Sequence, residues 1–262
     1  ISYNQLLDLY FHDNKYEYYM TRAKLKTLEQ RIAQATDDYK KAINNTTDEK
    51  EIITARYLLA QSYEIINKPM QAIDEYLKIL DHDHNENVYL SLANLYYTED
   101  KPAAINVLQQ AINHYPQSVA IKEFLCQLYL ATGNCEQAEK YAVSVFNKIK
   151  ALLMQEKNDE AYELLQTLTD KDKQDISYPA LMAEYYYNKG EDENTLKYIE
   201  MFEKLNPDSP LPSQMRALVY EKQNNDYEAH YNWGKYYIKK NNHELALDEY
   251  LNAYNTNPKD TR

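Results

Sequence analysis

The chain has 262 residues, of which 44% are apolar and 27% are charged, a balance that suffices to bury a sizeable core. No stretch approaches the roughly 18 consecutive apolar residues of a membrane-spanning helix, so we expect no membrane insertion. The 41 acidic and 29 basic residues give a formal charge of −12, which repels phosphate backbones and argues against a nucleic-acid partner. Only 3 glycines are present, far below the usual fraction of about 7%, and this scarcity favours an all-helical chain over a sheet protein with many tight turns.

The N-terminal portion, residues 1–52, is the least regular part of the sequence. Its apolar residues Leu6, Leu7 and Tyr10 predict a helix, and the polar stretch His12–Lys15 predicts a turn after it. Helical spacing without Gly or Pro then runs over Tyr16–Ile43, with one face formed by Leu25, Leu28, Ile32, Ala35, Tyr39 and Ala42. We interpret this portion as a divergent capping repeat; the alternative is one long helix used for oligomerisation or docking. The polar run Asn44–Lys50 predicts a loop.

Two sequence signatures recur after this loop. The first signature consists of a large residue, then Leu or a similar residue, a small residue and an aromatic residue. Its copies are Arg56-x2-Leu59-Ala60-x2-Tyr63, Tyr89-x2-Leu92-Ala93-x2-Tyr96, Lys122-x2-Leu125-Cys126-x2-Tyr129, Pro179-x2-Met182-Ala183-x2-Tyr186 and His230-x2-Trp233-Gly234-x2-Tyr237. The second follows each copy: Ala72-x3-Tyr76-x2-Ile79, Ala104-x3-Leu108-x2-Ala111, Ala138-x3-Ala142-x2-Val145, Thr195-x3-Ile199-x2-Phe202 and Ala246-x3-Tyr250-x2-Ala253. Pro116, Pro207 and Pro258 close three of these units.

This pattern resembles the tetratricopeptide repeat, in which a first helix carries an aromatic residue, Leu, a small residue and Tyr, and a second helix carries Ala, an aromatic residue and Pro. The small residues let the two helices of a hairpin approach closely, and each hairpin keeps an apolar face that only a neighbouring hairpin covers. We therefore expect an all-α fold, a right-handed α-solenoid of stacked antiparallel helix hairpins over residues 53–262. Its repeats are predicted near residues 53–85, 86–118, 119–141, 142–175, 176–209 and 227–260, with a half repeat at 210–226.

The register of the repeats slips twice. The steps from Ala60 to Ala93 and from Ala93 to Cys126 are both 33 residues, but only 23 residues separate Ala138 from Ala161. We expect one long helix there, in which a second helix runs directly into the next first helix through Val145, Ile149, Leu152 and Leu153. A step of 17 residues between Ala217 and Gly234 predicts that the helix around Asp226–Lys239 closes one hairpin and opens the next. A missing segment is the alternative explanation of both slips.

Residues with chemistry of their own are few. The run Asp81-His82-Asp83-His84 places two imidazoles near carboxylates, but it falls where a solvated loop between repeats is expected, so we predict no metal site. Cys126 fills a small-residue packing slot and Cys135 begins a second helix, and two cysteines make no disulfide framework. Free thiols favour a reducing, cytoplasmic location. We expect no enzyme activity and no cofactor.

Tyrosine is strongly overrepresented, with 28 Tyr against 4 Phe and 1 Trp. The resemblance implies that first helices line a concave groove, and the residues that flank the packing slots on these helices are Tyr57, Gln61, Asn94, Tyr97, Phe124, Gln127, Phe146, Lys150, Glu184, Tyr187, Tyr231 and Lys235. Aromatic rings supply contact area, and amides pair with a peptide backbone in both directions. Codon usage in a genome of low GC content is the alternative explanation of the tyrosines.

The predicted function is a noncatalytic protein-protein interaction scaffold that binds a peptide or helix of a partner protein in this groove. The alternative is a regulatory or docking arm of a larger enzyme whose catalytic domain lies outside this chain. A third possibility is a homo-oligomer that forms through the terminal repeats.

Overall fold

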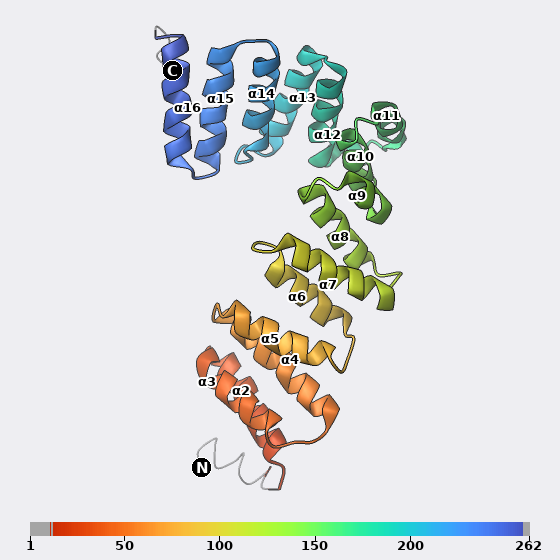
Figure 1. Ribbon diagram of the computed structural model, residues 1–262, viewed down its shortest axis with the longest axis vertical. Coiled ribbons are helices and arrows are strands. Elements are labelled where there is room, and N and C mark those ends of the chain that lie inside the picture. Colours follow the sequence, from red (N-terminus) through yellow and green to blue (C-terminus); the bar gives the residue numbers. More distant parts are fainter. Residues whose placement is uncertain (1–10, 12, 259–262) are drawn as a thin grey trace. The chain divides into compact units, whose positions relative to one another are not determined.

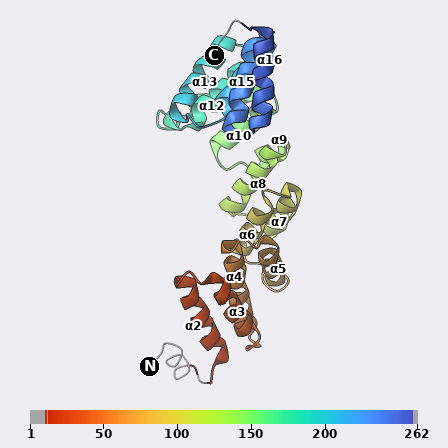
Figure 2. The same ribbon diagram turned by 90° about the vertical axis from the view of Figure 1, so that its left-hand side faces the viewer.

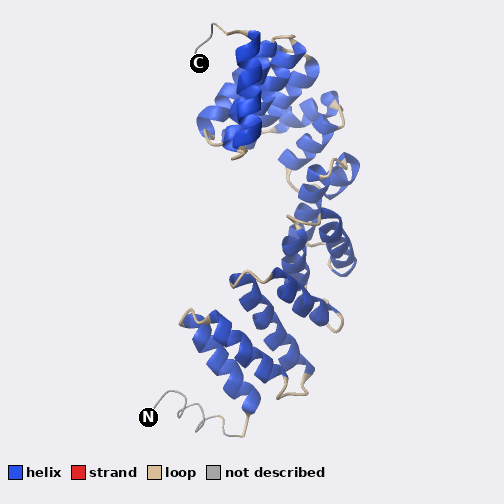
Figure 3. Ribbon diagram, turned by 60° about the vertical axis from the view of Figure 1, so that its left-hand side comes forward, coloured by secondary structure: helices blue, strands red, loops and turns tan. Residues whose placement is uncertain are grey.

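The computed structural model describes residue 11 and residues 13–258, and this part of the chain consists of helices joined by short loops (Figure 1, Figure 3). Two compact units divide the chain, residues 1–128 and residues 129–262. The helix predicted around Leu6, Leu7 and Tyr10 lies outside the described residues. No helix among the described residues has both the length and the apolar content that crossing a membrane requires.

In its described residues, the first unit contains three helical hairpins and the start of a further helix. Its elements are α2 (Lys15–Leu28), α3 (Ile32–Ile43), α4 (Glu49–Ile65), α5 (Pro69–Leu80), α6 (Glu86–Tyr96), α7 (Lys101–His114) and α8 (Val119–Ala131), whose last turn belongs to the second unit. Each helix packs on the next one along the chain from α2 to α7. The predicted packing slots form the core here, because Ala60, Ala93 and Ala104 have no exposed surface.

The second unit continues with shorter helices and then returns to full-length ones. Its elements are α9 (Cys135–Tyr141), α10 (Val145–Met154), α11 (Asn158–Thr167), the 3-10 turn η1 (Asp172–Gln174), α12 (Ser177–Lys189), α13 (Asp192–Leu205), α14 (Leu211–Lys222), α15 (Asp226–Lys239) and α16 (His243–Thr256). The hairpins α10–α11 and α12–α13 pack on each other mainly through their first helices, α10 and α12. These first helices also form walls of the pocket that is described below.

Most of the hairpin turns share one backbone device. A residue with positive φ ends the first helix; these residues are Gln30, Asn67, Gly133, Glu156, Gly190, Asn224 and Asn241. In each case the next amide donates back to a carbonyl five residues earlier, as the Asn134 amide does to the Tyr129 carbonyl at 2.9 Å. This is the Schellman closure of a helix, and Asn and Gly tolerate the left-handed conformation that it requires. Asparagine side chains then cap several second helices, as Asn134 does for α9.

The N-terminal portion is a hairpin, and the alternative of one long helix over Tyr16–Ile43 is wrong. A turn at Glu29–Arg31 separates α2 from α3, and Gln30 there has φ of 60°. The predicted apolar face is correct for Ala35, which is fully buried, but wrong for Leu28, which is 81% exposed. Helical spacing alone does not reveal this turn, because no Gly or Pro marks it.

The long helix predicted between Ala138 and Ala161 is also wrong. Extended backbone at Ala142 and Ser144, with ψ of 120° and 134°, separates α9 from α10. A second turn with Glu156 at φ 58° separates α10 from α11. The short register step arises because these helices have only 7, 10 and 10 residues, where 13 or 14 are common elsewhere in the chain. Three shortened helices replace the single fused helix that the apolar spacing predicted.

The half-repeat step near the C-terminal end has the predicted structural basis. Helix α15 packs against α14 (Figure 1) and also against α16 (Figure 1, Figure 2), so it closes one hairpin and opens the next. Gly234 lies on α15 at the contact with α16, where a Cβ atom would lie 2.5 Å from a ring carbon of Tyr250. The smallest residue therefore sets the distance between these two helices.

Candidate functional site

A pocket of about 620 Å³ lies in the second unit on the faces of three first helices, α10, α12 and α14. We call it the second-unit pocket, and the residues that line it are Phe146, Asn147, Lys150, Met154, Ile176, Ser177, Ala180, Leu181, Glu184, Tyr187, Asn188, Phe202, Asn206, Leu211, Gln214, Met215 and Leu218. Most of these side chains are apolar, and the polar ones include four amides. Such a volume lies within the range of roughly 300–1,000 Å³ that is typical of ligand sites in proteins.

Helical periodicity places these side chains on common faces. Phe146, Lys150 and Met154 are spaced i, i+4, i+8 on α10, and Ala180, Glu184 and Tyr187 are spaced i, i+4, i+7 on α12. Helix α14 contributes Leu211, Met215 and Leu218 with the same i, i+4, i+7 spacing, which makes one apolar stripe. Three stripes from successive first helices therefore meet at one surface.

The wall that α12 provides is held from two sides. The Asn188 amide donates to the Leu153 carbonyl at 3.0 Å and to Asn158 Oδ1 at 3.1 Å, which ties α12 to the α10–α11 hairpin. On the other side the Lys222 amine donates to the Tyr187 carbonyl at 3.3 Å and lies 4.7 Å from the centre of the Tyr187 ring. A cation above a ring face is attracted to that ring. Lys222 therefore contacts both the backbone and the ring of Tyr187.

Glu184 and Lys150 are the charged residues that line the pocket. Burial raises the pKa of the Glu184 carboxyl, and the positive charge of Lys150 partly opposes that rise. Among the described residues no hydrogen bond or ion pair engages the Glu184 carboxylate, while Lys150 itself is exposed. The pocket thus combines one half-buried acidic group with an exposed cation on a surface that is otherwise mostly apolar and amide.

The structure brings together four of the site residues that the sequence predicted, namely Phe146, Lys150, Glu184 and Tyr187. The other two predicted residues of the second unit, Tyr231 and Lys235, do not line this pocket. The Lys235 amine lies 5.2 Å from the centre of the Tyr231 ring, and that ring lies 5.9 Å from the ring of Tyr250 on α16. Tyr231 therefore contributes to the packing of α15 on α16.

The predicted site residues of the first unit divide into packing residues and exposed ones. The Tyr57 ring lies 6.0 Å from the ring of the buried Tyr76, and Gln61 is half-buried. Tyr97 and Phe124 form a ring pair at 5.9 Å, and the Lys101 amine lies 5.9 Å from the Tyr97 ring. Two amide side chains, those of Asn94 and Gln127, are exposed.

Sequence reasoning missed the contribution of α14 to the pocket. Leu211, Gln214, Met215 and Leu218 were not predicted, because the segment 210–226 was interpreted only as a half repeat. The i, i+4, i+7 spacing of Leu211, Met215 and Leu218 was the available signal. Phe202 was predicted only as a packing position of the second signature, and no pattern in the sequence indicated Asn206.

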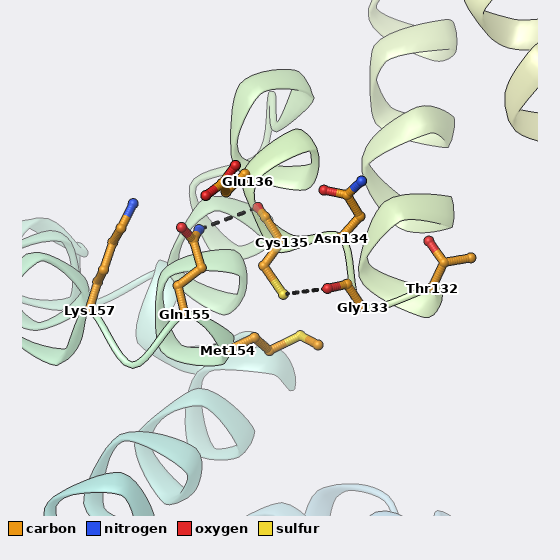
Figure 4. Close-up of a pocket in the computed structure, with 8 residues that line it drawn as sticks. All are labelled: Thr132, Gly133, Asn134, Cys135, Glu136, Met154, Gln155 and Lys157. Atoms are coloured by element: carbon orange, nitrogen blue, oxygen red, sulfur yellow. Dashed lines mark hydrogen bonds between the residues drawn. The ribbon is translucent and has the colours of Figure 1, made fainter.

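A second pocket of the same unit, about 670 Å³ in volume, surrounds Cys135 (Figure 4). The Cys135 thiol lies 3.5 Å from the Gly133 carbonyl, and the Gln155 amide donates to the Cys135 carbonyl at 3.3 Å. Burial raises the pKa of this thiol, and the charge of Glu184 adds to the rise. Burial likewise raises the pKa of the Cys126 thiol to about 11. Both thiols are held in the protonated form, which is a poor nucleophile.

The histidines of the Asp81–His84 loop point to different partners. His82 Nδ1 lies 3.0 Å from Glu49 Oε1, whereas the His84 ring stacks on His114 with ring centres 3.8 Å apart. The Tyr89 hydroxyl lies 2.8 Å from His84 Nδ1. Over the described ranges, 11 and 13–258, no group of three His, Cys, Asp or Glu side chains is arranged to hold a metal ion. Both imidazoles engage protein partners.

Comparisons with known proteins find structures of similar fold but no matching sequence family. No family model and no curated protein sequence matches the chain. A crystal structure of a tetratricopeptide repeat protein from Parabacteroides merdae matches with a TM-score of 0.70 and 16% identity, over 91% of this chain and 98% of that one. The human IFIT1 dimer, solved with m7Gppp-AAAA, matches with a TM-score of 0.54 and 13% identity, over 97% of this chain and 68% of that one.

A structure of Naa15/Naa10 bound to HypK-THB matches with a TM-score of 0.50 and 14% identity, over 95% of this chain and 41% of that one. At these identities the likenesses show the fold alone. They agree with the helical hairpins and the buried small residues described above. The chain therefore has a tetratricopeptide-like repeat fold.

Proposed function

We propose that this protein is a noncatalytic interaction scaffold that binds a peptide segment or helix of a partner protein in the second-unit pocket. The observation that carries the proposal is the convergence of α10, α12 and α14, whose stripes combine Phe146 and Tyr187 with the apolar residues of α14. Rigid aromatic side chains give large contact areas at a small cost in conformational entropy.

Amide groups in the pocket lining suit a peptide better than a purely apolar ligand. Asn206 and Gln214 line the pocket beside Leu211 and Leu218. Each amide carries a donor and an acceptor, so it is able to pair with the N–H and the carbonyl of an incoming backbone. The net charge of −12 argues against a nucleic acid as the ligand.

Replacement of Tyr187 by Ala tests the proposal. Peptides are selected from a random peptide library on the immobilised protein, and the affinity of the tightest one is measured by isothermal titration calorimetry. Tyr187→Ala should weaken binding about tenfold or more, which corresponds to about 1.4 kcal/mol, because the substitution removes an aromatic ring that lines the pocket. The melting temperature should change little, since the ring is only half-buried.

Tyr254→Ala is the matched control, because Tyr254 is 57% exposed on α16 in the same unit and lies outside the pocket. This variant should bind the selected peptide with the affinity of the unaltered protein. The proposal fails if Tyr187→Ala binds normally, or if both variants lose affinity equally.

A further inference from the structure

The Glu184 carboxylate lines the second-unit pocket without a hydrogen-bond or ion-pair partner among the described residues. It projects from the middle of the α12 stripe, between Ala180 and Tyr187, and its surroundings are sufficiently desolvated to raise its pKa. The Glu184 side chain is half-buried, and charged groups that are partly removed from water are usually paired in folded proteins. Within the described part of the chain, no hydrogen bond or ion pair meets this expectation for Glu184.

The nearby cation, Lys150, does not form an ion pair with Glu184. Lys150 is exposed, and its charge only opposes the effect of burial on Glu184 without forming an ion pair. Side chains of α14 and α13 that line the same pocket are the apolar Leu211, Met215 and Phe202 and the neutral amides of Gln214 and Asn206. An incoming group that carries a positive charge would therefore meet one carboxylate and no cation from those helices.

We propose that the segment bound in the second-unit pocket carries a lysine or arginine that pairs with Glu184, next to an apolar side chain that packs against Phe146, Tyr187 and Leu218. This inference rests on the proposed function and specifies the chemistry of the partner. Charge complementarity selects the occupant, because an acidic segment would place a second carboxylate against a carboxylate that already lacks a partner. A charge-assisted hydrogen bond in a desolvated site is stronger than an exposed ion pair.

The test is a double-mutant cycle between protein and peptide. The tightest peptide from the random library is synthesised with its basic residue and, separately, with norleucine at that position, which keeps the aliphatic stem and removes the charge. Glu184→Gln should weaken binding of the basic peptide about tenfold or more and should change the affinity of the norleucine peptide much less. Glu184→Lys should reverse the preference, so that selection on this variant enriches acidic residues instead.

Two controls separate recognition from folding. Glu163→Gln removes an exposed carboxylate from α11 in the same unit and should leave both affinities unchanged. Glu184→Gln should retain the helical circular dichroism and the melting temperature of the unaltered protein, because no partner within the described residues loses a bond.

Each outcome decides between the two proposals. Selected peptides without enrichment of lysine or arginine, or a Glu184→Gln variant with unchanged affinity for the basic peptide, would overturn the basic-partner inference and leave peptide binding intact. If no peptide binds, or if binding does not depend on Tyr187, the proposed function fails and this inference fails with it. Enrichment of basic residues that Glu184→Gln abolishes supports both.

Discussion

At the scale of single residues, Asp38 is the clearest case of a charge that the fold has compensated. Its side chain is 1% exposed, yet Arg22 Nε and Nη2 donate to its two oxygens at 2.7 and 2.5 Å, and Lys26 Nζ donates at 2.6 Å. Burial alone would raise the pKa of Asp38, but the hydrogen bonds and charges of Arg22 and Lys26 outweigh it and hold the pKa below its usual range. Asp38 and Glu184 are therefore opposites, because the protein pairs Asp38 with two cations, whereas no ion pair engages Glu184 among the described residues.

Replacement of Asp38 by Asn should lower the free energy of unfolding by about 3 kcal/mol, because it leaves two cations at the partly buried position without their carboxylate. The pH dependence has a definite sign. A depressed pKa stabilises the folded state above the unfolded-state pKa of about 3.9, and this contribution is lost as pH falls through the folded-state pKa. Urea unfolding measured from acid to neutral pH should show a shallower acid decline for Asp38→Asn. An unchanged slope would contradict this assignment.

At the scale of elements, the close contact between α15 and α16 depends on Gly234, which has no Cβ atom. Gly234 is buried on α15, and an added Cβ would overlap ring carbons of Tyr250 at 2.5 to 2.8 Å. Alanine is intrinsically the better helix former by about 1 kcal/mol, so helix propensity and packing oppose each other at this position. Packing should dominate, because the half-buried Tyr250 ring also packs against the Tyr231 ring and has to shift against that contact.

Gly234→Ala should therefore destabilise the protein by roughly 1–3 kcal/mol despite its gain in helix propensity. Chemical denaturation measures the effect for Gly234→Ala, for Tyr250→Leu and for the double variant. Because the narrower leucine relieves the overlap, the double variant should lose less stability than the two single variants together. Strict additivity would show that the two side chains do not compete for space.

At the scale of the whole molecule, successive helices pack on one another within each unit, from α2 to α7 in the first and from α9 to α16 in the second, which is the arrangement of repeat proteins. Stability in such a chain is approximately a sum of local terms and interfaces between neighbours. A defect in one hairpin should consequently remain local, whereas a single cooperative core would distribute it evenly.

Ala93→Leu tests this expectation. Ala93 has no exposed surface on α6, so the larger side chain should overpack the α6–α7 hairpin at a cost of roughly 1–3 kcal/mol. Hydrogen exchange followed by mass spectrometry should show faster exchange in α5, α6 and α7, with α15 and α16 unchanged. Equal acceleration in α15 and α16 would contradict local behaviour.

Much of the local structure could be predicted from the sequence by itself. The helices, the small residues at Ala60 and Ala93 and the double role of α15 follow from spacings of a few residues, because helix periodicity and the contacts within a hairpin are local. Four pocket residues, including Glu184 and Tyr187, were found because they flank packing slots on first helices.

Tertiary structure alone decided where the helices break and which stripes meet. The apolar spacing of Val145, Ile149 and Leu152 continues through neighbouring turns that no Gly or Pro marks, so the turns at 142–144 and 155–157 escaped prediction. The pocket is formed by α10, α12 and α14 together, whereas Tyr231 packs toward α16 and does not line it. Neither result could be predicted, because both depend on how successive hairpins stack. That stacking is set by the fit of complete helix faces, which no short-range pattern in the chain encodes.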